Sequence, residues 1–222
     1  GPGSQASIKG GKQMQRRQVG ILIFPEVEVL DFCGPYEVFT AARLDEARRR
    51  EDPSPFQVWV VAEQEEAIAT AAGMRVLPDC ALAACPALDI LVVPGGWGTR
   101  RQLQNETLID WLAERGRQVI SSGTLASVCT GALLLGQAGL LDGRRATTHW
   151  RSLQLLRESF PRVTVEERLH VVEDGNLITS AGIAAGLDLA LKVVARYYGE
   201  GVARATARHM EYRYPQDNAR RI

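Results

Sequence analysis

Short apolar runs that stop abruptly constrain the fold of this chain more than any other feature of its sequence. The clearest are 19–24, which Pro25 ends, 88–93, which Pro94-Gly95-Gly96 ends, and 124–128, which Cys129 ends. Apolar runs of this length without alternation are typical of strands buried on both faces of a parallel sheet. Segments with helical spacing of apolar residues separate the runs. We therefore predict an α/β fold, with a mostly parallel sheet sandwiched by helices.

The remaining elements follow from patterns of the same kind. We expect strands at 56–62 and 145–148, a short hairpin at 67–78, and a strand at 163–173 that pairs with 177–180 across Asp174-Gly175-Asn176. We expect helices at 35–50, 108–123, 131–139, 150–159, 185–198 and 200–210. One domain, 18–210, would hold all of these elements. Residues 1–17 would be a tag remnant (1–4) and a disordered N-terminus, and 211–222 a C-terminal tail.

Charge and hydropathy exclude several classes of protein. Lys and Arg together number 26, as do Asp and Glu, so the formal net charge is zero. A dedicated nucleic-acid binder usually has a basic surplus, and attachment to a membrane surface needs a polybasic segment. No stretch reaches the ~18 apolar residues that a membrane span needs. We therefore expect a cytoplasmic protein that, by this chain alone, binds neither nucleic acid nor membrane.

The sequence predicts neither a metal site nor a cofactor. Cys80 and Cys85 have no histidine near them in the sequence, which argues against zinc. A chain of this size in a reducing compartment needs no disulfides. His170 and His209 have no motif around them, and we expect structural roles for both.

The segment Ser127-Val128-Cys129-Thr130-Gly131 has the spacing of a nucleophile elbow. A strand passes into a helix at Cys129, and small residues two before and two after it let the backbone fold sharply. The thiol would lie at a helix N-terminus, where the helix dipole and free amides lower a thiol pKa. The alternative is a buried cysteine that acts as a small hydrophobe.

Three more positions lie near the expected carboxyl ends of strands, where sites of open α/β sheets form. Asp31 is either an N-cap or an acid/base group. Gly95 and Gly96 could offer amides to an oxyanion, or could simply form a tight turn. His149 could be a base for the cysteine, or a hydrogen-bonded residue of the wall.

Together these segments resemble the ThiJ/PfpI superfamily, whose fold is flavodoxin-like and related to class I glutamine amidotransferases. The resemblance covers about 19–198 and rests on five motifs in order: Leu30-Asp31-Phe32-Cys33-Gly34-Pro35, Val93-Pro94-Gly95-Gly96, Ser127-Val128-Cys129-Thr130-Gly131, Ala146-Thr147-Thr148-His149-Trp150 and Ser180-Ala181-Gly182-Ile183-Ala184-Ala185-Gly186-Leu187-Asp188. Members of the superfamily usually pair, so the resemblance implies a homodimer.

Two residues direct the resemblance to one branch, that of isonitrile hydratases and the sensor domains of AraC-type regulators. Asp31 replaces the Glu of protease-like and glyoxalase-like members, and Thr130 replaces the His that follows the cysteine in the protease-like members. One departure is Ser180-Ala181-Gly182, where the hydratase has a glycine run before the residue that corresponds to Ile183. The regulator domains share this variant.

The resemblance implies a hydratase that adds water to a small electrophile, best an isonitrile, giving an N-substituted formamide. Cys129 would be the nucleophile, Asp31 the acid/base group, and Thr130 a donor near the sulfur. Gly95, Gly96, His149 and Ile183 would line the substrate site. Such an Asp31 should be protonated or share a proton with Cys129. The alternatives are a small-molecule sensor domain related to AraC-type regulators, or a glyoxalase- or deglycase-like enzyme on reactive aldehydes. We do not expect a DNA-binding unit within 211–222, so the chain would be either a stand-alone enzyme or a fragment of a longer regulator.

Overall fold

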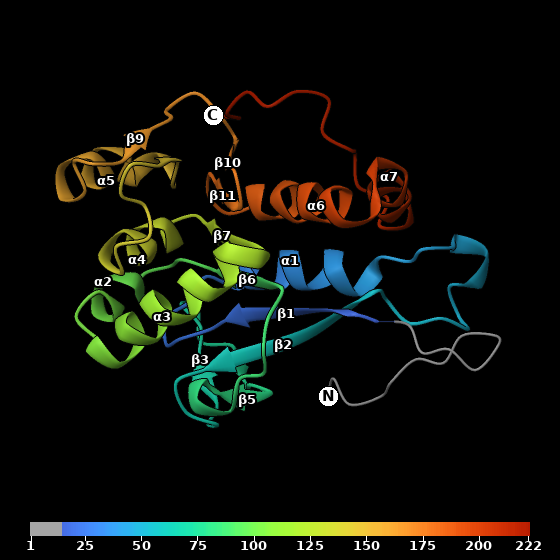
Figure 1. Cartoon of the computed structure of the whole chain (residues 1–222), viewed down its shortest axis with the longest axis horizontal. Coiled ribbons are helices and arrows are strands. Elements are labelled where there is room, and N and C mark those ends of the chain that lie inside the picture. Colours follow the sequence, from blue (N-terminus) through green and yellow to red (C-terminus); the bar gives the residue numbers. More distant parts are fainter. Residues whose placement is uncertain (1–14) are drawn as a thin grey trace.

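The computed structural model describes residues 15–222, so the expected tag remnant and most of the expected disordered N-terminus lie outside the described residues. A seven-stranded sheet forms the centre, in the order β10-β11-β7-β6-β1-β2-β5 (Figure 1). Every neighbouring pair in it is parallel except β10 and β11, which are antiparallel. The predicted fold class is thus confirmed.

The apolar runs form the middle of this sheet, where both faces are covered. Its strands are β1 (Arg17–Leu22), β2 (Phe56–Ala62), β5 (Cys80–Ala81), β6 (Ile90–Val93), β7 (Thr124–Val128), β10 (Val171–Asp174) and β11 (Leu177–Ser180). Two small sheets lie beside it: β3 (Ile68–Ala69) with β4 (Arg75–Val76), and β8 (Arg145–Ala146) with β9 (Thr164–Val165). The carboxyl ends of β6 and β7 are adjacent, because Val93 pairs with Ser127.

Helices cover both faces of the sheet (Figure 1). On one face, α1 (Val29–Ala41) packs against α6 (Ala185–Tyr198) and α7 (Glu200–His209). On the other, α3 (Glu106–Ser122) and α4 (Gly131–Gln137) pack against β6 and β7, with α2 (Thr99–Gln102) and α5 (Leu153–Ser159) beside α4. Three short turns of 3-10 helix complete the elements: Glu46–Arg48, Leu82–Ala84 and Trp150–Ser152. No helix within residues 15–222 has the length and apolar content to cross a membrane.

Two predicted elements differ from the structure. The helix expected at 35–50 is α1, which begins at Val29 and ends at Ala41, so Pro35 lies inside it rather than in its first turn. The strand expected at 163–173 is divided into β9 and β10, which belong to different sheets. The hairpin between β10 and β11 forms as predicted, and Gly175 at its turn has a φ of 57°. A positive φ is what a tight hairpin turn requires there.

The ordered domain begins before residue 18, where we expected it to start. β1 begins at Arg17, and the guanidinium of Arg16 donates to the carbonyls of Ser54 and Phe56, at 2.9 and 3.0 Å. These bonds tie the start of β1 to the start of β2.

The C-terminal tail is also tied to the domain. Leu169 and Ala219 form a bridge beside β10, and the Asn218 side chain bonds both backbone groups of Val171. Asp188 on α6 accepts hydrogen bonds from Tyr212 and Arg221 of the tail, at 2.7 and 2.6 Å. The tail therefore packs on the edge of the sheet that carries β10 and β11.

Candidate functional site

Cys129 lies at a sharp corner between β7 and α4, as the elbow spacing predicts. Its φ is 58°, in the left-handed region that a residue with a side chain rarely occupies. Two hydrogen bonds hold this backbone: Cys129 N–H donates to the Ala181 carbonyl at 3.3 Å, and the Thr148 hydroxyl donates to the Cys129 carbonyl at 2.8 Å. Strain of this kind persists only where surrounding contacts maintain it, and it concentrates at functional positions.

Asp31 is fully buried behind the elbow, in the first turn of α1. It does not cap that helix, because its Oδ2 accepts a 3.0 Å hydrogen bond from Gly95 N–H instead. Its Oδ1 is buried and has no hydrogen-bond partner among the described residues. Burial raises the pKa of this carboxyl to about 8, although the Gly95 bond opposes the rise. Asp31 is therefore largely protonated at neutral pH, as the electrostatic argument requires.

The thiol of Cys129 does not have the lowered pKa that its position before a helix predicts. Burial raises its pKa, and the neighbouring Asp31 carboxyl adds to the rise, whereas the amide and hydroxyl of Thr130 oppose it. Cys129 is 5% exposed, and α4 has only seven residues, so loss of solvation outweighs the helix end. Cys129 thus rests as a thiol beside a protonated carboxyl, a pair whose two pKa values depend on each other.

The amides of Gly95 and Gly96, expected to face an oxyanion, already have partners. Gly95 N–H donates to Asp31, and Gly96 N–H donates to Thr130 Oγ1 at 3.0 Å. The loop after β6 lies so close to the elbow that a Cβ on Gly95 would be 2.2 Å from Thr130 Oγ1. The role of these glycines in this structure is therefore close packing: they bring Asp31 and Thr130 against one backbone segment.

Thr130 connects the elbow to the following segment. Besides accepting from Gly96, its Oγ1 lies 2.8 Å from Thr99 Oγ1 at the start of α2. This contact fixes α2 relative to the nucleophile.

His149 lies at the wall of the site and does not act on the sulfur through a hydrogen bond in this structure. Its Nδ1 accepts from Arg151 N–H at 3.1 Å, capping the helical turn that begins at Trp150. Burial, with the charges of Arg151 and Arg220, lowers its pKa. Its ring also fills the space beside Gly182, where a Cβ would meet His149 Cδ2 at 2.1 Å. Of the two alternatives for His149, this arrangement matches a hydrogen-bonded residue of the cavity wall rather than a base for Cys129.

A cavity of about 550 Å³ opens over the elbow. Of the predicted site residues, it brings together Gly96, Cys129, Thr130, His149 and Ile183, while Asp31 and Gly95 do not line it. Sequence reasoning missed the other lining residues, which are Glu28, Trp97, Thr99, Arg100, Leu133, Arg151, Ser152 and Leu155. Several of these lie one to three residues from a predicted site residue. This closeness in the sequence is the feature from which they could have been predicted.

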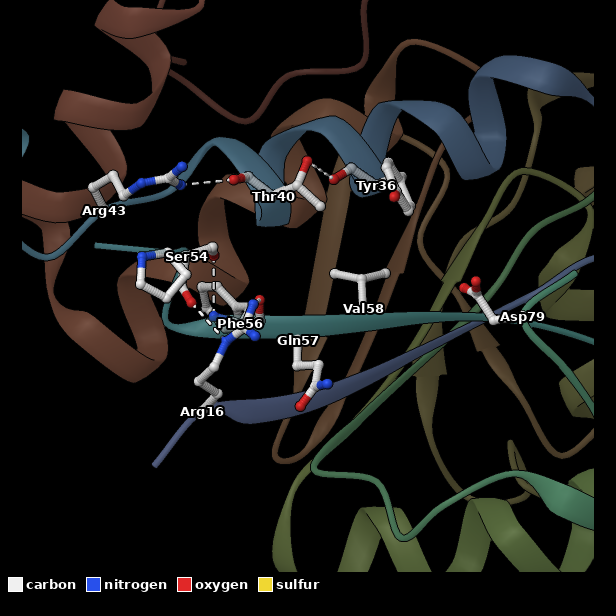
Figure 2. A pocket seen from close by; sticks show the side chains of 10 residues that line it. Arg16, Tyr36, Thr40, Arg43, Ser54, Phe56, Gln57, Val58 and Asp79 are labelled. Carbon is white, nitrogen blue, oxygen red and sulfur yellow. Dashed lines mark hydrogen bonds between the residues drawn. The ribbon is translucent and has the colours of Figure 1, made fainter. Parts of the chain in front are cut away.

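A second cavity, of about 260 Å³, lies at the start of β2, and none of the predicted site residues lines it (Figure 2). Arg43 lies on its α1 side and donates to the Thr40 carbonyl at 2.8 Å. Arg16 lies below β2 and donates to the carbonyl of Phe56. Arg43 thus holds the end of α1 through its carbonyls, and Arg16 holds the starts of β1 and β2 together.

His170 and the other three cysteines do not line the cavity over the elbow. His170 is buried and its Nε2 is 2.8 Å from Asp188 Oδ2. Cys33, Cys80 and Cys85 are free thiols whose pKa values burial raises. Within residues 15–222, no three His, Cys, Asp or Glu side chains converge in a way that would hold a metal ion.

The chain is similar to proteins of one known family. A family model described as the DJ-1/PfpI family matches residues 17–196. An isonitrile hydratase from Pseudomonas putida is 37% identical over 195 residues, which is 88% of this chain and 78% of that protein. A ThiJ/PfpI family protein from Pseudomonas syringae has a crystal structure that matches with a TM-score of 0.78 and 31% identity, covering 92% of this chain and 79% of that chain.

Transcriptional regulators are also among the relatives. The HTH-type transcriptional regulator GbdR of Pseudomonas aeruginosa is 35% identical over 153 residues, which is 67% of this chain. The matched part is only 40% of the regulator's own length.

Proposed function

The chain belongs to the DJ-1/PfpI family, and from this membership and the geometry of the site we propose that it is an enzyme that hydrates isonitriles. Cys129 is the nucleophile and Asp31 is the acid/base group in this proposal. The observation that carries it is the pairing of a strained Cys129 in a cavity with a fully buried, protonated carboxyl directly behind it. The reaction converts an isonitrile and one water into an N-substituted formamide.

In the first step, the sulfur of Cys129 adds to the terminal carbon of the isonitrile. A C–S bond forms, the carbon gains one proton, and the product is a thioimidate on the enzyme. The thiol supplies that proton overall, and Asp31 relays it: the carboxyl gives its own proton to the carbon and accepts the thiol proton at its other oxygen. A neutral carboxyl can do this without a net change of charge, which suits its burial.

In the second step, water adds to the thioimidate carbon. The C–S bond then breaks, the sulfur regains a proton, and the formamide leaves. The Thr130 amide and hydroxyl favour negative charge on the sulfur as it departs. Asp31 is still protonated at this stage, so it gives its proton to the thioimidate nitrogen while its other oxygen takes one from the water. As the C–S bond breaks, the new hydroxyl on the carbon loses its proton through Asp31 to the sulfur, so the enzyme ends in its starting protonation state.

The similarity to the isonitrile hydratase supports this proposal, because it extends over most of both chains. Asp31 and Thr130 distinguish the chain from the protease-like and glyoxalase-like branches of the superfamily that it resembles. A cytosolic setting is part of the same proposal, since the thiols of the described residues are free.

A second candidate is a small-molecule sensor domain like those of AraC-type regulators. Two observations favour it: the raised pKa of Cys129, which keeps the thiol protonated at neutral pH, and the match to a regulator. In a sensor, the same cavity would bind a ligand without a covalent step, and Cys129 would be a wall residue.

A screen of reactive small molecules tests the proposal directly. The purified protein and a Cys129→Ala variant are each incubated with simple isonitriles and, separately, with dicarbonyls. We expect formamide from isonitriles with the unaltered protein only. Turnover of dicarbonyls alone would support an aldehyde-acting enzyme, and turnover of neither would support the sensor.

A further inference from the structure

The cavity over Cys129 has an apolar part and a charged part. Apolar side chains come from Trp97, Leu133, Leu155 and Ile183. The charged residues of the lining are Arg100, Arg151 and Glu28. His149 adds no positive charge at neutral pH, because burial and neighbouring arginines lower its pKa. The charged lining is therefore positive by one unit.

The Arg151 guanidinium is held in position by its neighbours. Its central carbon lies 4.5 Å from the centre of the Trp150 ring, a cation–π contact. The Trp150 ring in turn stacks on His149, with 5.7 Å between ring centres and 27° between ring planes. The backbone amide of Arg151 bonds His149 Nδ1. This arrangement reduces the freedom that Arg151 would lose on binding a ligand.

The helix that carries Arg100 contacts Thr130, the residue that follows the proposed nucleophile. It lies on α2, one residue after Thr99, and Thr99 Oγ1 contacts Thr130 Oγ1 at 2.8 Å. A change in α2 would therefore alter Arg100 and the segment beside Cys129 together.

Neither guanidinium has a carboxylate partner within residues 15–222. No ion pair joins Arg100 or Arg151 to an acidic side chain there, although many of the other arginines form one. Within these residues neither positive charge is therefore neutralised by an ion pair, and Arg is suited to bind a carboxylate through paired hydrogen bonds.

We infer that this site takes isonitriles whose substituent is an apolar or aromatic group bearing a carboxylate, which Arg151 and Arg100 bind while Leu133, Leu155 and Ile183 contact the apolar part. The inference rests on the proposed function and specifies its substrate class. A volume of about 550 Å³ accommodates a substituted ring, within the usual range of small-molecule sites.

The test compares two substrates that differ in charge at one end, para-isocyanobenzoate and its methyl ester. The measured quantity is the ratio of kcat/KM for the acid to that for the ester. We expect a ratio of about ten or more at low salt that falls as salt is added, since hydrogen bonds to charged groups exceed those to neutral ones. Arg151→Gln and Arg100→Gln should each lower this ratio severalfold, because the acid loses a charged hydrogen bond that the ester does not make.

Arg101→Gln is the matched control, because Arg101 follows Arg100 on α2 and does not line the cavity. This variant should keep the ratio of the unaltered protein. An equal kcat/KM for acid and ester, or a ratio that Arg100→Gln and Arg151→Gln leave unchanged, would overturn the inference while leaving the hydratase proposal in place.

A binding measurement separates failure of the inference from failure of the proposed function. If neither isonitrile reacts, para-formamidobenzoate and its methyl ester are compared as protectants of Cys129 against iodoacetamide. Stronger protection by the acid, lost in Arg151→Gln, would support the anion site even without turnover. Equal protection by the two compounds, or protection by neither, would reject it.

Discussion

The hydroxyl of Thr148 donates a 2.8 Å hydrogen bond to the carbonyl oxygen of Cys129, and both residues are buried. This bond satisfies a backbone acceptor at the corner where Cys129 has a φ of 58°. Thr148→Val keeps the shape of the side chain but removes the donor. We expect it to lower the free energy of unfolding by about 1–3 kcal/mol and to slow Cys129-dependent turnover.

The control for this variant is Thr124→Val, since Thr124 is also buried and its hydroxyl is 2.9 Å from Tyr197 Oη, away from the site. Denaturant unfolding and turnover would be measured for both variants. A Thr148→Val protein that loses stability like Thr124→Val but retains full turnover would contradict a role for Thr148 in holding the elbow.

The buried carboxyl of Asp31 should make stability depend on pH in a definite direction. Its pKa is raised from an ordinary 3.8 to about 8 in the folded chain. Between these values the unfolded carboxyl is ionised and the folded one is protonated, so folding takes up a proton and this contribution weakens as pH rises. Asn does not titrate, so the stability of Asp31→Asn relative to the unaltered protein should increase with pH, by up to about 1.4 kcal/mol per unit.

Denaturant unfolding of both proteins at intervals from pH 4 to 8 gives this difference, because other titrating groups cancel in the comparison. A difference that stays constant over this range would show that Asp31 is ionised in the folded chain. It would also remove the proton relay from the mechanism.

Arg220 connects the C-terminal tail to the site. Its guanidinium donates to the Thr148 carbonyl at 3.1 Å, to the Glu167 carbonyl at 2.7 Å, and to Thr147 Oγ1. We expect Arg220→Gln to destabilise the fold by about 1–3 kcal/mol and to lower the rate of Cys129 alkylation or turnover through the segment that contains Thr148.

Arg213→Gln is the control for the tail, because Arg213 is exposed and lies in the same segment. Thermal unfolding and turnover should be unchanged in this variant. If Arg220→Gln behaves like Arg213→Gln in both assays, the tail does not support the site.

The expected homodimer can be tested by mass in solution. Large apolar side chains are exposed on the β3–β4 hairpin and beside it, with Met74 at 55% and Leu77 at 72%, and on α1, at Leu30 and Tyr36. The backbone bond from Ala71 to the Val27 carbonyl keeps the hairpin near the start of α1. Light scattering at micromolar concentration should give twice the mass of one chain, and Leu77→Asp should shift the population toward one chain. A single-chain mass for the unaltered protein would exclude the homodimer.

The sequence predicted the parts of this fold that depend on local pattern. The central strands β2 and β7 and the helix α6 have the predicted limits, because a run of apolar residues or a helical stripe ends there at a sharp break. The position of Cys129 at a corner also followed from local spacing. The start of α1 did not, since no side chain caps this helix and Leu30 is 37% exposed, so neither a cap nor a buried apolar stripe marks its first residues.

The chemistry of the site depended on contacts between distant segments, which spacing does not reveal. The helix-end argument predicted the wrong direction for the Cys129 pKa, because it could not include burial or the proximity of Asp31. Gly95 and Gly96 occur where an oxyanion site was expected, yet their amides bond Asp31 and Thr130. Arg151, which also lines the cavity, contacts His149 and Trp150, and no motif in the sequence marks these contacts.

The most direct test of the proposed mechanism is the formation of N-substituted formamide from a simple isonitrile by the unaltered protein, by Cys129→Ala and by Asp31→Asn. We predict product with the unaltered protein and none above background with Cys129→Ala, because no other cysteine lines the cavity. Asp31→Asn should retain the fold and lose about 100-fold or more in rate, a typical loss for a positioned acid/base group. Equal formamide from the unaltered protein and Cys129→Ala, or none from either at millimolar isonitrile, would contradict the account.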